Sequence, residues 1–103
     1  MKISRAKVLV AVTAYAKAQF VPQAFDDVKT GRVDEVNFDR MYLESSIVEV
    51  MVVTLSKSMF QGSVVLTIAG TQRDGQVVKV GRECESILAV CKFIADVIED
   101  WTL

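Results

Sequence analysis

Apolar residues recur at helical spacing over about residues 83–101, which is the clearest pattern in the chain. One stripe combines residues three or four positions apart, namely Ile87, Cys91, Ile94 and Ile98. A second strip beside it consists of Val90, Phe93 and Val97. Together the two strips cover more than half of the circumference of the expected helix, wider than contact with one sheet face usually requires.

Two further helices are expected in the first third of the chain. Residues 4–20 are apolar nearly all round, and Ser4 is placed to cap the first turn of a helix there. Pro22 suits the first position of a short second helix, and Gly31 follows as a stop signal. Phe25 and Val28 would be its inward residues.

The middle of the chain favours strands. Residues 46–56 are rich in Val and Ile, and both faces are apolar apart from Glu49, which indicates a central strand or one that pairs across an interface. A helix remains an alternative there, because apolar residues also align at helical spacing. Residues 63–69 and 76–80 are the clearest strands, and Asp74-Gly75 supplies a tight turn between them.

The sequence therefore predicts an α+β protein with two layers, formed by one domain over residues 1–103. Helices would pack on one face of a three-stranded antiparallel meander, in the order α-α-?-β-β-β-α. The question mark stands for residues 33–44, where a strand and a helix fit about equally well. The alternative is a mostly α protein with a β-hairpin wing, if residues 33–60 prove helical.

The composition agrees with one globular domain. Hydrophobic residues make up 51% and charged residues 24% of the 103 positions, so a real core can form. The formal net charge is -1. This balance argues against binding that depends on bulk attraction to phosphate.

The first 16 residues have the outline of a secretory signal, with basic residues followed by an apolar run. The run is short and Thr13 interrupts it, so we expect a helix of the domain instead. It is also too short to cross a bilayer, and we expect a cytoplasmic protein with no membrane segment. The two cysteines, Cys84 and Cys91, would lie about 10 Å apart on one helix, too far for a disulfide.

Candidate catalytic chemistry is sparse. The chain has no histidine, so the commonest general base and the commonest transition-metal ligand are missing. Asp96, Glu99 and Asp100 share a helix surface, but a solvated face explains them better than a Mg²⁺ or Ca²⁺ site. No glycine-rich phosphate loop is present. We therefore expect no enzyme, no cofactor and no metal.

Charge gives one specific structural expectation. Basic residues begin the first helix and acidic residues end the last one, and both choices oppose the helix dipole unless the two ends are neighbours. We therefore expect one of Lys2, Arg5 and Lys7 to lie close to Asp96, Glu99 or Asp100.

The favoured function is a small non-enzymatic protein-interaction module, because the chain has more apolar surface than one small core readily hides. We expect a homodimer and an unknown protein partner. The expected interface residues are Val90, Phe93, Val97, Trp101 and Met59. Small proteins of this kind often act as inhibitors, adaptors or chaperones, many of them encoded by phages or mobile elements.

The alternative is a small nucleic-acid-binding regulator that uses the hairpin of residues 70–82. Its expected contacts are Arg73, Lys79 and Arg82. The order of helix, three strands and helix is also that of double-stranded-RNA-binding domains, which carry lysines at the start of the last helix. Here Glu83 and Glu85 stand in that stretch and would repel phosphate, so the chain is not assigned to them.

Overall fold

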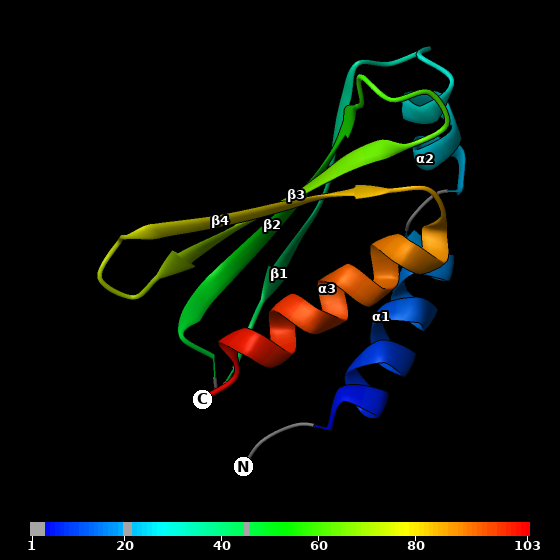
Figure 1. Ribbon diagram of the computed structural model, residues 1–103. Coiled ribbons are helices and arrows are strands. Elements are labelled where there is room, and N and C mark those ends of the chain that lie inside the picture. Colours follow the sequence, from blue (N-terminus) through cyan, green and yellow to red (C-terminus); the bar gives the residue numbers. More distant parts are fainter. Residues whose placement is uncertain (1–3, 20–21, 45) are drawn as a thin grey trace.

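The described residues form a two-layer α+β arrangement of three helices and one four-stranded sheet (Figure 1). The computed structural model describes the backbone of residues 4–19, 22–44 and 46–103, and within these ranges all side chains except 15–19, 22, 38 and 39. The elements are α1 (Arg5–Gln19), α2 (Pro22–Lys29), β1 (Glu35–Tyr42), β2 (Val48–Lys57), β3 (Val64–Gln72), β4 (Val77–Cys84) and α3 (Ile87–Trp101). The sheet is an antiparallel meander in the order β1-β2-β3-β4.

The predicted α+β class is confirmed, but the sheet has a fourth strand that the sequence left open. Residues 33–44 contain β1, whose register on β2 shifts between Asn37 and Asp39. This bulge resets the alternation of faces, so that Val36 and Met41 both pack against the core although they are an odd number of positions apart. Arg40 then stands opposite Val52 and points away from the core, so it no longer breaks the strand pattern. The mostly α alternative is therefore wrong.

Local signals place the helix ends largely as expected. The Ser4 hydroxyl accepts a hydrogen bond from the Lys7 amide at 3.2 Å and caps α1. Gly31, which follows α2, has a positive φ of 81° that glycine adopts without strain. The last helix starts later than predicted, because residues 83–84 complete β4 and Ser86 caps α3 by accepting from the Ala89 amide at 3.1 Å.

The core lies between the inner face of the sheet and the helices. Buried side chains alternate with partly exposed ones from Met51 to Leu55 in β2 and from Val64 to Ile68 in β3, and the fully buried ones include Met51, Leu55, Leu66 and Ile68. Ile94 of α3 is also fully buried against them. The doubly apolar segment 46–56 is therefore a central strand, as one of the two interpretations predicted.

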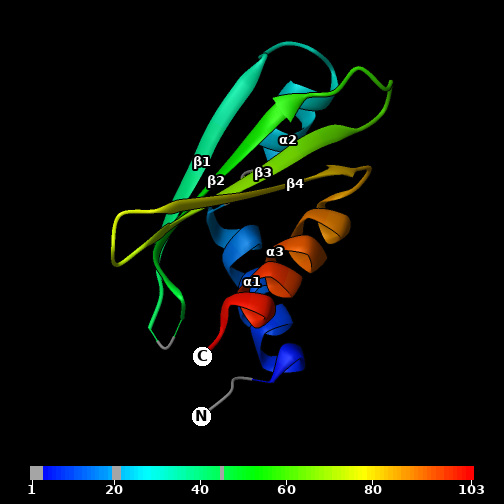
Figure 2. The ribbon, with the colours of Figure 1, turned by 60° about the vertical axis from the view of Figure 1, so that its left-hand side comes forward.

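The three described helices lie on the same side of the sheet, and within the described ranges the opposite face has no helix over it (Figures 1 and 2). Both α2 and α3 contact strands, whereas α1 packs mainly on α3. The ends of α1 and α3 meet as the charge pattern predicts, because Arg5 forms an ion pair with Asp96 and lies 3.7 Å from Glu99. Lys2, another basic residue named in that expectation, lies outside the described residues.

Candidate functional site

A groove of about 590 Å³ lies between α1 and β1, because α1 packs on α3 and stands off the sheet. Its apolar lining comes from three elements and the turn after β1: Val8, Ala11, Val12, Met41, Leu43 and Ile98. The volume falls within the range of ligand sites in proteins. The groove is therefore large enough to take several apolar side chains of another molecule.

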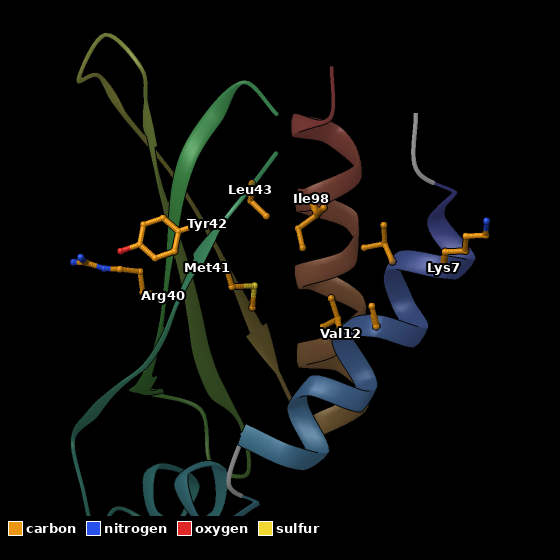
Figure 3. Close-up of a pocket in the computed structure, with 9 residues that line it drawn as sticks. Lys7, Val12, Arg40, Met41, Tyr42, Leu43 and Ile98 are labelled. Atoms are coloured by element: carbon orange, nitrogen blue, oxygen red, sulfur yellow. The ribbon is translucent and has the colours of Figure 1, made fainter. Parts of the chain in front are cut away.

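The side chains around the groove divide into two sets (Figure 3). Met41 and Leu43 point from the strand toward α1 and Ile98, so they form an apolar floor. Arg40 and Tyr42 project from the other side of the strand, away from α1. The groove thus offers apolar contact with little charge directed into it.

The free edge of β1 runs beside this groove. β1 is the first strand of the sheet order, and among the described residues it pairs only with β2. The Leu43 amide donates to the Glu49 carbonyl at 3.0 Å, so the backbone groups of Leu43 point toward β2. Backbone groups alternate in direction along an antiparallel strand, so those of Tyr42 and Arg40 face the free edge.

Four of the five residues predicted for a protein interface lie in the core of this chain. Val90, Phe93, Val97 and Trp101 are at most 7% exposed. The extra apolar strip of α3 is covered by the sheet and by α1 rather than by a partner, which corrects their assignment as interface residues. Met59 differs, because it is 90% exposed in the loop between β2 and β3.

The three cations predicted to contact nucleic acid do not converge. The Arg73 guanidinium donates to the Ser46 carbonyl at 2.9 Å. Arg82 lies on the helix side of β4, with its guanidinium 4.6 Å from the ring centroid of Phe93. Lys79 is exposed, and it is an odd number of positions from Arg82 along β4, so it points to the opposite face. They therefore do not form one basic surface.

Both cysteines are free and buried, but they do not share a helix as predicted, because Cys84 ends β4 and Cys91 lies in α3. Burial raises the pKa of the Cys84 thiol to about 11, partly offset by the nearby charge of Arg82. Burial also raises the pKa of the Cys91 thiol, and a hydrogen bond with Thr13 offsets part of this rise. A raised pKa leaves little thiolate near neutral pH, so neither group is an activated nucleophile.

Metal chemistry has equally little basis in the part of the chain that is described, which contains no group of three or more potential metal-ligating side chains. Asp96 and Glu99, two members of the acidic cluster, are occupied by Arg5. No described helix combines the length and apolar character needed to cross a membrane.

Comparison with known proteins adds no assignment. No protein-family model matches the chain, and neither a curated protein nor a solved structure is significantly similar to it.

Proposed function

We propose that this chain is a non-enzymatic protein-interaction module that binds an extended segment of a partner polypeptide along the free edge of β1. One observation carries the proposal: between β1 and α1, an apolar groove runs beside a strand edge that pairs with no other described strand. Strand addition uses these two features together, since the backbone supplies affinity and the pocket selects alternate side chains.

The strand edge determines how such a segment would bind. Its backbone would hydrogen-bond the outward groups of Arg40 and Tyr42, while every second side chain would enter the groove over Met41 and Leu43. The bulge at residues 37–39 interrupts regular pairing on the other half of β1, which limits strand addition to the part beside the groove.

This mode fits a partner that presents a short extended stretch with apolar residues at alternate positions. An inhibitor, an adaptor or a chaperone can each work in this way. The nucleic-acid alternative has less support, because Arg73, Lys79 and Arg82 face different directions.

To test the proposal, peptides that bind the wild-type protein are selected from a random library displayed on phage. The affinity of the selected peptides is then measured by calorimetry. The decisive variant is Tyr42→Pro, which removes an amide at the free edge but no hydrogen bond to β2. Its matched control is Tyr42→Ala, which removes the same side chain and keeps the amide. We expect Tyr42→Pro to weaken binding at least tenfold and Tyr42→Ala to weaken it much less.

A second pair of variants tests the groove. Ala11→Phe places a ring in the groove, whereas Ala6→Phe places the same ring on α1 outside its lining. We expect only Ala11→Phe to reduce peptide binding. Selected peptides without alternating apolar residues, or equal affinity for all four variants, would overturn the proposal.

A further inference from the structure

The face of the sheet that no helix covers has an ordered pattern of side chains. Strand register aligns its outward residues in rows that cross all four strands. The row at one end consists of Tyr42, Val50, Thr71 and Val77. Tyr42 and Val77, at the two edges, are 73% and 60% exposed. The centre of the face is formed by small and branched side chains, which suits packing against a second sheet.

Two other rows carry charge of opposite sign at their edges. The basic row consists of Arg40, Val52, Ala69 and Lys79. The acidic row consists of Glu35, Ser56, Val65 and Glu83. In β2 these rows are four residues apart, which corresponds to about 13 Å along the strand. The row of Thr54 and Thr67 lies halfway between them.

These edge charges have no counter-charge in the part of the chain that is described, because no ion pair there includes Arg40, Lys79, Glu35 or Glu83. Glu83 is also held in place, since one of its carboxylate oxygens accepts hydrogen bonds from Ser58 at 2.6 Å and Ser63 at 2.7 Å. A fixed carboxylate loses less conformational entropy when a cation binds it.

We propose that a second copy of this chain covers the open face, with the two sheets stacked by a two-fold axis that runs along the Thr54–Thr67 row. This rotation reverses the strand direction and brings the basic row of each copy onto the acidic row of the other. Arg40 then faces Glu35 of the second copy, and Lys79 faces Glu83. The charge pattern is therefore complementary to itself in this orientation.

Some exposed apolar residues do not belong to this interface. Met59 and Phe60, in the loop beyond the acidic row, are 90% and 62% exposed. Both line hollows with the end of α2, and Phe60 also lines one with the start of α3, so they lie on the helix side of the sheet, outside the proposed interface. An axis parallel to the strands would instead place like charges together, which disfavours that arrangement. The free edge of β1 stays open in the dimer, so this inference is independent of the proposed peptide site.

Charge reversal followed by mixing tests the pairing, with mass measured by light scattering after gel filtration. Variant A carries Arg40→Glu and Lys79→Glu, and variant B carries Glu35→Lys and Glu83→Lys. We expect a dimer for the wild type, a monomer for each variant alone, and a dimer when equal amounts of A and B are mixed. If variant B does not fold, as judged by circular dichroism, Glu35→Lys alone replaces it.

Crosslinking tests the direction of the axis. A short bismaleimide should join two copies of Thr54→Cys, because this residue faces itself across the axis. It should not join Val50→Cys, whose two copies would be about 26 Å apart along the strands. The wild type is the blank, since Cys84 and Cys91 are buried. A monomeric wild type, dimeric single variants, no dimer in the A and B mixture, or crosslinking at Val50 overturns the proposal.

Discussion

Arg5 in the first turn of α1 and Asp96 in α3 form an ion pair that joins two helices from opposite ends of the chain. Arg5 also lies 3.7 Å from Glu99, and Arg82 approaches Asp96 to 3.9 Å. One Asp96 oxygen and one Glu99 oxygen are buried without a hydrogen bond, and Arg5 is the cation that approaches both of them. The pair therefore holds α1 antiparallel to α3, and this placement opens the groove beside β1.

Loss of this pair should loosen α1 more than the rest of the fold. We expect Arg5→Ala to lower the free energy of unfolding by about 1 kcal/mol, because Arg5 is half exposed and exposed pairs contribute little. Lys7→Ala is the control, since no described ion pair includes Lys7. Urea denaturation measures the change, and equal effects of the two variants would contradict it.

Gly70 allows Trp101 to pack against β3. A Cβ atom at position 70 would lie 2.6 Å from the Trp101 ring and 2.7 Å from Val48. We expect Gly70→Ala to destabilise the protein by about 1–3 kcal/mol, the usual cost of overpacking a core. Gly81→Ala is a matched control in β4, because its nearest atom would be 3.6 Å away and it should be nearly neutral. Thermal unfolding of both variants distinguishes the outcomes.

Cys84 should make stability depend on pH in the alkaline range. Its folded pKa of about 11 exceeds the ordinary value of 9.0, so the unfolded chain loses this proton first. The protonated Cys84 thiol therefore makes its full contribution to the free energy of unfolding below about pH 9, and this contribution falls as the pH rises from there to about 11. Urea titrations at several pH values measure this slope, which Cys84→Ala should reduce. An unchanged slope in that variant would contradict the assignment.

Arg82 should stabilise the fold rather than bind nucleic acid. Its guanidinium stacks on Phe93, so Arg82→Ala should cost about 0.5–1 kcal/mol of stability. Lys79→Ala, from the opposite face of β4, should change stability much less. Retention on heparin tests the alternative function, nucleic-acid binding. Strong retention that weakens with salt and is lost in either variant would favour the nucleic-acid regulator.

Periodicity in the sequence predicted most of the elements because long apolar patterns dominate over local detail. The helix predicted from the apolar stripe of α3 and the strands around Asp74-Gly75 are present. The charge pattern also predicted that Arg5 and Asp96 lie close together. β1 was ambiguous because its bulge shifts the alternation of faces by one residue. A bulge depends on pairing with a neighbouring strand, and a single sequence does not display that pairing.

The candidate sites were harder to predict than the elements. A wide apolar arc on α3 indicated an interface, but α1 and the sheet cover it, so Phe93 and Val97 are core residues. The groove forms because α1 packs on α3 and not directly on the sheet. This is a tertiary arrangement that no local pattern in the sequence indicates. The charge rows did have a signal, since Arg40 follows Glu35 by five residues and Lys79 precedes Glu83 by four, but only the strand register aligns the two pairs.

Sedimentation equilibrium of the wild-type protein over a wide range of concentrations tests most directly whether the fold leaves apolar surface for another chain. We expect an average mass that rises from the 11.4 kDa of one chain toward twice that value as concentration increases. A mass that stays at 11.4 kDa at every concentration would contradict it.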